Sequence, residues 1–310
     1  MKIKIHNWQH KANNLESALI RMGVQITKRE PDILLVDFDA GVSYYTELIE
    51  KTFAGGSEIV LYSHGAPVIT AWDMVWEPDK RIAVFLAQSE GEKEVMQAYD
   101  YPNPIEVIGW HYCKQKKFKP VKEIKKVLFA PWHPHSNGYL MPACREANRN
   151  AYEKLRAMPY NLTVMHIGNV RNNGISIDPD VTYIGSEKSI PFSLKHIDQA
   201  DVVISNLMTV ACIAIARGKP VVVFGQNIKP HDGYSDENLS YVKNWEKYRD
   251  LMRYPYDLSN LKPRASQYMI EHAALHEAEE WREKFIGDPL DVEKLMTVLE
   301  RVLSKDEENE

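Results

Sequence analysis

The chain of 310 residues contains few cysteines: three, at Cys113, Cys144 and Cys212. Their spacing matches no metal-binding cysteine motif, and so few thiols indicate a reducing compartment instead of a disulfide-stapled secreted domain. Long apolar runs are also missing, since none approaches the ~20 residues that a membrane-spanning helix needs. The N-terminal residues include lysines but no apolar stretch behind them, so we expect no signal peptide. These features predict a soluble, cytoplasmic protein.

Neither sign of charge dominates the composition. Lys and Arg number 38 against 43 Asp and Glu, which gives a net charge of −5 with histidine neutral. The surface as a whole is therefore not expected to attract nucleic acid, although a local basic stripe stays open. The hydrophobic content of 44% is ordinary for a globular protein, and the length allows two domains with a core each. No internal repeat of solenoid period is present.

Apolar runs of strand length alternate with helical patterns through most of the chain. In the first part we expect buried strands at residues 3–5, 32–37, 58–62, 82–87 and 105–108, with helices near 15–22, 42–53 and 90–99. Seven lysines then lie between Lys114 and Lys126 without a long apolar run. This composition is typical of a solvated linker between domains, the alternative being a basic strip that faces a polyanionic acceptor.

The alternation resumes after this lysine-rich segment. Strands are expected at residues 126–130, 162–167, 181–184, 202–204 and 221–224, with helices at 142–157, 192–197 and 209–216. Two further helices are expected at 264–285 and 291–303. This order predicts an α/β protein of two Rossmann-like, doubly wound domains that face each other across a cleft. The predicted domains are residues 1–118 and 119–285, and a helix with an acidic tail at 286–310 could return to the first domain.

Residues 198–227 form the clearest βαβ unit of the chain. One buried strand ends at Ser205 and Asn206, an apolar helix follows from Thr209, and a second strand opens onto Gln226 and Asn227. The N-terminus of such a helix exposes unpaired N–H groups that suit a phosphate. A βαβ unit that belongs to the core and binds nothing is the alternative. Polar residues at the carboxyl ends of both strands favour a site, because open α/β sheets bind ligands there.

Polar clusters follow other predicted strands as well. They lie at residues 7–14 and 63–67 in the first domain and at 133–137, 168–169 and 226–227 in the second. A histidine in such a cluster can act as a general base, since its pKa lies near neutrality. His133 and His135 are similar to a metal-ligand pair, but the Asp and His spacing of a metallohydrolase does not accompany them. We therefore predict no catalytic metal.

Three segments carry a resemblance to a known superfamily. ADVVISNLMTVACIAIARGKPVVVFGQ, residues 200–226, resembles the donor segment of the GT-B superfamily of nucleotide-sugar glycosyltransferases. KVLFAPWHP, residues 126–134, resembles the ILYAPTWR loop of its CDP-glycerol glycerophosphotransferase branch, and LYSHGAP, residues 61–67, resembles the WHGTP turn of that branch. The UDP-N-acetylglucosamine 2-epimerases share this fold. The likeness extends over nearly the whole chain.

The resemblance implies roles for particular residues. Ser205, Asn206 and Thr209 would lie near the donor diphosphate and Gln226 near the sugar hydroxyls, while the backbone at Ile184 and Gly185 would pair with the nucleotide base. With the strand-end positions added, the predicted donor-binding residues are His133, His135, Gly168, Asn169, Ile184, Gly185, Ser205, Asn206, Thr209, Gln226 and Asn227. The predicted base is His10 or His64, and the predicted acceptor-binding residues are Trp8, Asn13, Asn14, Ser63 and Gly65.

Three departures from the superfamily pattern bear on the donor. Leu207 and Met208 replace the small residues of the phosphate turn. Ile213 stands where a helix glutamate often binds the ribose hydroxyls, and the arginine after the APT-like loop is missing. These differences put the identity of the donor in doubt more than the fold.

The predicted function is transfer of a sugar from a nucleotide diphosphate donor, a UDP-sugar by expectation, to an acceptor hydroxyl. The prediction includes no cofactor and no metal, because helix N–H groups can balance the charge of the leaving diphosphate. A hydroxymethylated pyrimidine in DNA is one possible acceptor. The alternatives are a polyol-phosphate transferase, a nucleotide-sugar epimerase, and a non-catalytic protein that binds nucleotides or glycans.

Overall fold

The structure is a computed structural model that describes residues 1–6, 14–37, 52, 54–63, 81–98, 100–132, 142–166, 174–185, 190–207, 209–228 and 250–304. These residues divide into two compact units. Unit 1 contains the described residues of Met1–Lys114 and Glu283–Glu310, and unit 2 those of Gln115–Glu237 and Trp245–Arg282. The division thus falls at Lys114 and again within helix α11 (Glu279–Phe285).

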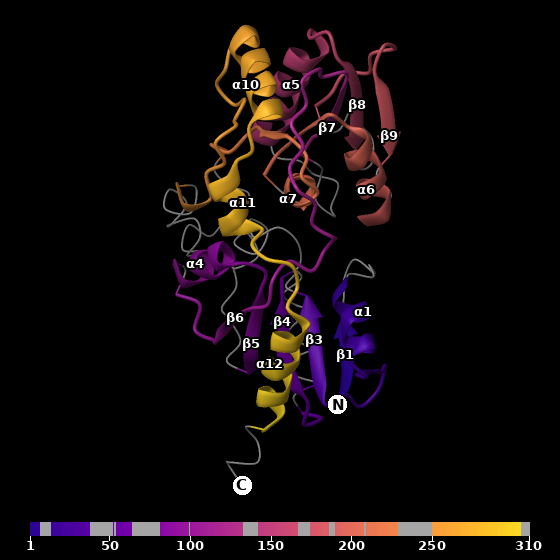
Figure 1. Ribbon diagram of the computed structural model, residues 1–310, viewed down its shortest axis with the longest axis vertical. Helices are drawn as coiled ribbons and strands as arrows, with labels where there is room; N and C mark the ends of the chain where they lie inside the picture. The colour runs from indigo at the N-terminus through magenta and orange to yellow at the C-terminus, as the bar shows by residue number, and fades with distance from the viewer. Residues whose placement is uncertain are drawn as a thin grey trace. The chain divides into compact units, whose positions relative to one another are not determined.

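Unit 1 is built on a six-stranded sheet in the order β2-β1-β3-β4-β5-β6, in which every described pair is parallel (Figure 1). The strands are β1 (Lys2–His6), β2 (Gln25–Ile26), β3 (Ile33–Asp37), β4 (Glu58–Tyr62), β5 (Ile82–Ala87) and β6 (Ile105–Val107). The apolar runs of the central strands β3, β4 and β5 are buried almost throughout, as in parallel strands that are covered on both faces. The sequences of these strands are therefore continuously apolar and do not alternate between apolar and polar residues.

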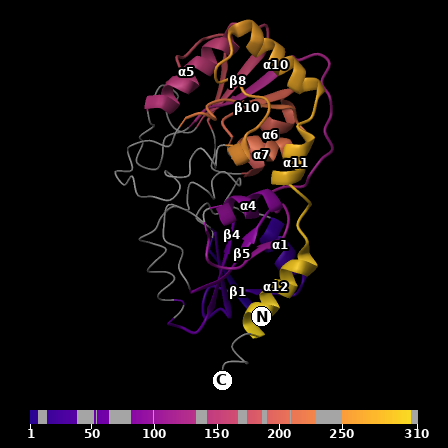
Figure 2. The same ribbon diagram turned by 90° about the vertical axis from the view of Figure 1, so that its left-hand side faces the viewer.

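Helices α1 (Asn14–Arg21) and α12 (Val292–Ser304) pack together in unit 1 (Figure 2). Leu15 and Leu19 of α1 join Leu295 and Leu299 of α12 in one buried cluster with the sheet. Helix α4 (Glu90–Ala98) contacts β5 and β6. The core of unit 1 thus combines its N-terminal strands with a helix almost three hundred residues away in the sequence.

Unit 2 is built on a five-stranded parallel sheet in the order β11-β10-β7-β8-β9. The strands are β7 (Lys126–Ala130), β8 (Asn161–His166), β9 (Thr182–Gly185), β10 (Val202–Ser205) and β11 (Val221–Val223), and the helices are α5 (Pro142–Arg156), α6 (Ile190–Gln199), α7 (Thr209–Ala216), α10 (Pro263–Leu275) and α11. Helices α6 and α7 contact each other and the strands β7, β10 and β11. Helix α7 is almost entirely apolar and buried, so it belongs to the interior.

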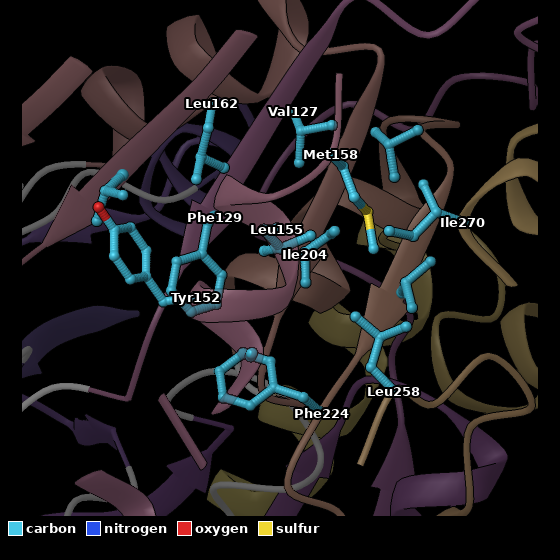
Figure 3. Packing of buried hydrophobic residues seen from close by; sticks show 14 of the residues in the cluster. Val127, Phe129, Tyr152, Leu155, Met158, Leu162, Ile204, Phe224, Leu258 and Ile270 are labelled. Carbon is cyan, nitrogen blue, oxygen red and sulfur yellow. The ribbon is translucent and has the colours of Figure 1, made fainter. Parts of the chain in front are cut away.

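Helices α5 and α10 contribute to the main core of unit 2 (Figures 2 and 3). Phe129 of β7 lies between the rings of Tyr152 and Phe224, at centroid distances of 6.4 and 5.4 Å. Ile270 of α10 and Leu155 of α5 belong to the same cluster, so both helices bury apolar side chains against the sheet.

The structure confirms the predicted fold class: two parallel sheets, each with helices, follow one another in the chain. Strands 58–62, 82–87 and 126–130 and helix 209–216 have the predicted bounds. The prediction missed β2, which is two residues long, and was wrong for the helix at 264–285. This segment forms α10 and α11, because His276 ends α10 with extended backbone angles of φ −127° and ψ 126°. The helix predicted at 42–53 lies almost entirely outside the described residues.

The lysine-rich segment differs from a solvated linker. Its backbone is hydrogen-bonded along unit 2, with Lys116 N–H donating to Ala216 O (2.8 Å) and Val121 N–H to Ala274 O (2.7 Å). Val121 and Ile124 pack against the core of that unit. Most of its lysine side chains are exposed.

Candidate functional site

The carboxyl ends of β7, β10 and β11 meet at one edge of the unit 2 sheet. Ser205, the last residue of β10, pairs with Ala130 of β7 on one side and Val223 of β11 on the other. Residues that follow these three strand ends must therefore lie close together. This edge is where an open parallel sheet binds a ligand.

Helix α7 starts four residues after the end of β10, at Thr209, and directs its N-terminus to this edge. The helix ends where Gly218 adopts a left-handed conformation with φ +69°. In this conformation the Gly218 N–H donates to Ile215 O and the Lys219 N–H donates to Ala214 O. A Cβ at Gly218 would lie 2.2 Å from the carbonyl oxygen of Lys117, so only glycine fits. The glycine thus fixes where α7 ends.

Asn206 lies in the link between β10 and α7. It is 3% exposed, and its side-chain Nδ2 has no hydrogen-bond partner among the described residues. The neighbouring Ser205 is also buried, and its Oγ donates to Ala130 O at 3.0 Å and lies 3.3 Å from Asn206 Oδ1. An unbonded buried amide N–H costs about 1–3 kcal/mol, so Asn206 Nδ2 is a donor that the described residues leave unused.

The loop after β11 is held by two hydrogen-bonded groups. Gly225 N–H donates to Ser259 Oγ at 2.8 Å, and Ser259 Oγ donates to Asp257 Oδ1 at 2.6 Å. The Gln226 amide bonds both backbone groups of Tyr254: Oε1 accepts from its N–H at 2.7 Å, and Nε2 donates to its carbonyl at 3.0 Å. The role of Gln226 at the sugar stays a prediction, and in this structure its amide anchors the loop. Asn227 is exposed.

The loop after β7 is held in the same manner. Asn148 of α5 is fully buried, and its Oδ1 accepts from Trp132 N–H at 2.8 Å while its Nδ2 donates to Trp132 O at 2.9 Å. The Trp132 side chain reaches the loop after β11, where a Cβ on Gly225 would lie 3.0 Å from its indole Nε1. Gly225 has φ +76° as well, so both its conformation and this contact require glycine.

The predicted donor residues that the structure describes fall into two groups. Ser205, Asn206, Thr209, Gln226 and Asn227 lie at the adjacent ends of β10 and β11. Ile184 and Gly185 lie on β9, at the far edge of the sheet and about 14 Å from β10 at the usual strand spacing. Gly185 is exposed, with open space where a side chain would be. None of these positions is tested for ligand contact, so their roles stay predictions.

At the carboxyl edge of the unit 1 sheet, Ser63 follows β4 and is fully buried. Its Oγ donates to Glu92 Oε1 at 2.6 Å and accepts from Gln88 Nε2, and its carbonyl accepts from Tyr112 Oη at 2.6 Å. Glu92 Oε2 accepts from Gln88 N–H at 2.6 Å. The predicted contact of Ser63 with an acceptor stays a prediction, and in this structure its hydroxyl belongs to a buried network.

His111 lies beside this network and is fully buried. Its ring packs against Tyr112 at 4.4 Å and Tyr62 at 5.8 Å between centroids. Burial lowers the pKa of the His111 imidazole to about 3, against a smaller opposite effect of the backbone at Gly109 and Ser63. His111 is therefore neutral at physiological pH.

Nine predicted site residues lie outside the described residues, so the structure gives no account of them: Trp8, His10, Asn13, His64, Gly65, His133, His135, Gly168 and Asn169. Asn14 is the first residue of α1. The predictions for these residues stay predictions.

Sequence reasoning missed the buried anchors Glu92, Gln88 and Asn148. Glu92 carried a signal, because Ser89 and Glu92 have the spacing of a capping box and Ser89 Oγ accepts from Glu92 N–H at 3.2 Å. Asn148 sits in the middle of a helix, where asparagine has no local reason to be favoured. No pattern in the sequence distinguishes it from the exposed Asn150 in the same helix.

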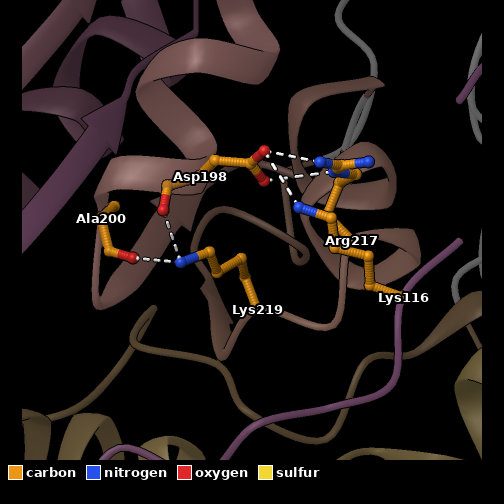
Figure 4. Close-up of polar contacts among 5 residues, drawn as sticks. All are labelled: Lys116, Asp198, Ala200, Arg217 and Lys219. Atoms are coloured by element: carbon orange, nitrogen blue, oxygen red, sulfur yellow. Dashed lines mark hydrogen bonds and ion pairs between the residues drawn. The ribbon is translucent and has the colours of Figure 1, made fainter. Parts of the chain in front are cut away.

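Charged groups gather at the opposite edge of the unit 2 sheet (Figure 4). The Asp198 carboxylate accepts from Arg217 and Lys116, and Lys219 Nζ donates to the carbonyls of Asp198 (2.8 Å) and Ala200 (2.7 Å). The hydrogen bond from Arg217 is the main reason that the pKa of Asp198 lies below its usual value. These ion pairs join the ends of α6 and α7.

Within the described part of the chain, no three His, Cys, Asp or Glu side chains come close enough together to hold a metal ion. All three cysteines are buried, and no disulfide joins them. No helix in the described ranges has both the length and the apolar content to cross a bilayer.

Solved structures of low sequence identity share the fold. A variant of the wall teichoic acid polymerase TagF is 10% identical with a TM-score of 0.53, and the match covers 99% of this chain and 89% of that one. TarM is 13% identical with a TM-score of 0.49, covering 89% of this chain and 55% of TarM, so the chain spans about half of TarM's length. The pneumococcal O-GlcNAc transferase GtfA, in complex with UDP and GlcNAc, is 12% identical with a TM-score of 0.38, covering 89% and 56%.

No protein-family model matches the sequence, and no curated protein matches it. The similarity to TagF extends over both units of this chain. It confirms the GT-B-like fold that the three sequence segments predicted.

Proposed function

We propose that the chain is a GT-B-type transferase that binds a nucleotide diphosphate donor at the carboxyl edge of unit 2 and transfers its sugar to an acceptor hydroxyl. One observation carries the proposal. The Asn206 amide is buried three residues before α7, and among the described residues its Nδ2 has no hydrogen-bond partner; the first N–H groups of α7 also lack helical partners. Hydrogen-bond donors at a helix N-terminus suit the negatively charged diphosphate of a sugar nucleotide.

The chemistry follows from charge. Transfer breaks the bond between the anomeric carbon and the diphosphate oxygen and forms a bond from that carbon to the acceptor oxygen. The acceptor proton passes to a base, for which His10 and His64 remain the candidates, and negative charge grows on the leaving diphosphate. N–H groups of α7, the Asn206 amide and the Thr209 hydroxyl would stabilise that charge. A UDP-sugar remains the expected donor.

Transfer of a polyol phosphate is the second candidate. The TagF structure that shares this fold is that of a wall teichoic acid polymerase, and two loops of this chain resemble the CDP-glycerol branch. In that reaction the acceptor oxygen attacks the second phosphorus and the P–O–P bridge breaks, so the nucleoside monophosphate leaves. The nucleotide released, UDP or CMP, therefore distinguishes the two reactions.

Donor binding is tested by thermal unfolding with UDP, CDP, ADP, GDP and dTDP. A nucleotide at a hundred times its Kd raises the free energy of unfolding by about 2.7 kcal/mol. We expect at least one to raise the Tm of the wild-type chain and of Asn150→Ala, an exposed control, and to lose most of this effect in Asn206→Leu. Equal shifts in all three proteins, or none in the wild type, would contradict the proposal.

The acceptor is tested with the donor that binds. Labelled UDP-sugars and CDP-glycerol are incubated with sugar and polyol acceptors and, in a separate arm, with duplex DNA that contains hydroxymethylated pyrimidine. Label that moves to one acceptor identifies its class. A new sugar epimer without any acceptor would indicate the epimerase alternative, and tight binding without turnover would indicate a binding protein.

A further inference from the structure

The starting observation is the double hydrogen bond between Asn148 and Trp132. Both backbone groups of Trp132 are bonded by one side chain, at 2.8 and 2.9 Å, and Asn148 is fully buried. A carboxamide is the side-chain group that presents one donor and one acceptor in a single plane, so it can match the N–H and C=O of one residue. Asn148 therefore fixes the backbone of Trp132 in one orientation.

The orientation of Trp132 matters because its side chain contacts a second loop. Ala130 and Val223 pair with Ser205 from opposite sides. Trp132 lies two residues beyond Ala130, and Gly225 lies two residues beyond Val223. The contact between the Trp132 indole and Gly225 thus joins the loops on either side of the Ser205–Asn206 strand end. Asn206, whose Nδ2 has no partner among the described residues, follows the strand between them.

The loop after β11 is fixed by a matching device. The Gln226 amide bonds both backbone groups of Tyr254, and Ser259 holds Gly225. Each of the two loops that flank Asn206 is thus attached to the rest of unit 2 by a side-chain amide bonded to both backbone groups of one residue. When the loops of a site are already ordered before the ligand binds, the binding free energy is not reduced by the cost of ordering them.

We propose that Asn148 is a positioning residue of the nucleotide-diphosphate site: through Trp132 and its contact with Gly225, it sets the separation of the two loops that flank Asn206. This inference rests on the proposed function. Asn148 itself touches no ligand, because it is fully buried beneath Trp132. Its loss therefore changes affinity by disordering the Trp132 loop and not by removing a ligand contact.

The test measures the Kd of UDP and CDP by calorimetry on the full chain, at a temperature well below the Tm of each variant. We expect Asn148→Ala to weaken the nucleotide that binds by roughly tenfold, since a supporting group lost beneath a site loosens its geometry. Asn150→Ala, an exposed asparagine in the same helix, is the matched control and should stay within about twofold of wild type. Trp132→Ala should weaken binding about as much as Asn148→Ala.

The double variant decides how Asn148 acts. If Asn148 acts through the Trp132 side chain, the double variant Asn148→Ala/Trp132→Ala should have the same Kd as the single variant that binds more weakly. The two losses are then not additive, because both substitutions act through the same contact. Additive losses, or a Kd of Asn148→Ala equal to that of Asn150→Ala, overturn the inference. If Asn148→Ala does not fold, an unchanged Kd in Trp132→Ala overturns it. A wild-type chain that binds none of the five nucleoside diphosphates overturns the proposed function as well.

Discussion

The two units hold the carboxyl ends of their strands with chemically different side chains. In unit 1 a carboxylate, Glu92, accepts from the Ser63 hydroxyl and the Gln88 N–H. In unit 2 a neutral amide, Asn148, bonds both backbone groups of Trp132. Each side chain is fully buried and comes from the helix that follows a strand.

The choice of a carboxylate in unit 1 and an amide in unit 2 follows from the hydrogen-bond donors and acceptors at each strand end. The groups around Glu92 are donors, and the first turn of α4 adds a favourable dipole, so a buried carboxylate finds its bonds. Trp132 offers one donor and one carbonyl, and a carboxylate would repel the carbonyl. Among the described residues, the buried carboxylate of Glu92 thus lies where hydrogen-bond donors face it. Exchanging the two chemistries tests this comparison.

The largest effect is expected when the neutral anchor receives a charge. Asn148→Asp is nearly isosteric but places a carboxylate against Trp132 O. We expect a loss of about 3–5 kcal/mol in the free energy of unfolding near pH 8, because a buried carboxylate that faces a carbonyl oxygen is costly. Burial should raise the pKa of the new carboxyl, so the loss should shrink as the pH falls towards 4. Urea unfolding at both pH values measures it, and a loss that does not vary with pH would contradict the explanation.

A smaller effect is expected when the charged anchor is neutralised. Glu92→Gln keeps the shape but replaces one accepting oxygen by an NH₂ group, which cannot accept from Gln88 N–H or Ser63 Oγ. A hydrogen bond to a charged group contributes about 1.5–3 kcal/mol, so we expect a loss of about 2 kcal/mol. Glu90→Gln is the control, since Glu90 is exposed in the same first turn of α4. Equal effects of both substitutions would mean that Glu92 acts only through the helix dipole.

The two edges should also differ in their response to pH. The pKa of His111 is about 3 in the folded chain, below its ordinary 6.5, so the unfolded chain takes up the proton first. The contribution of His111 is therefore complete above pH 6.5 and is lost as the pH falls from there towards 3. Between pH 7.5 and 5.5 this loss is about 1.4 kcal/mol. In His111→Phe the free energy of unfolding should fall by about 1.4 kcal/mol less than in the wild type between pH 7.5 and 5.5. Urea unfolding at both pH values measures this, and the same pH dependence in both proteins would show that His111 is not the group that titrates.

The smallest change in stability is expected at Asn206. Its Nδ2 makes no bond among the described residues, so Asn206→Leu removes a desolvated donor and should leave stability unchanged or raise it by up to about 1 kcal/mol. Asn148→Leu, at an equally buried but bonded asparagine, should instead cost about 2–3 kcal/mol, since both backbone groups of Trp132 lose their partner. Thermal unfolding of the two variants gives the comparison. A large loss in Asn206→Leu would show that the amide serves the fold.

Most of the fold could be predicted because apolar continuity and helix signals are local. The strand at 126–130 reads as KVLFA, and the helix from Thr209 to Ala216 is bounded by Gly218. The break between α10 and α11 could not be read, since His276 carries no helix-ending signal such as glycine or proline. At the site, polar residues at strand ends led to Asn206. Asn148 stayed hidden because its value depends on a hydrogen-bond partner sixteen residues away, which no local pattern reports.

The return of the chain to unit 1 has a consequence for folding. Leu295 and Leu299 of α12 lie in the same buried cluster as Ile3 and Leu15, so that core stays open until residues far along the chain have been synthesised. The described strands of unit 2 all precede α12, and unit 2 can collapse on its own sheet first. Contacts between residues nearly three hundred positions apart form slowly, because the loop between them must first be closed. During synthesis unit 1 is therefore completed after unit 2, although the strands of unit 1 precede those of unit 2 in the sequence.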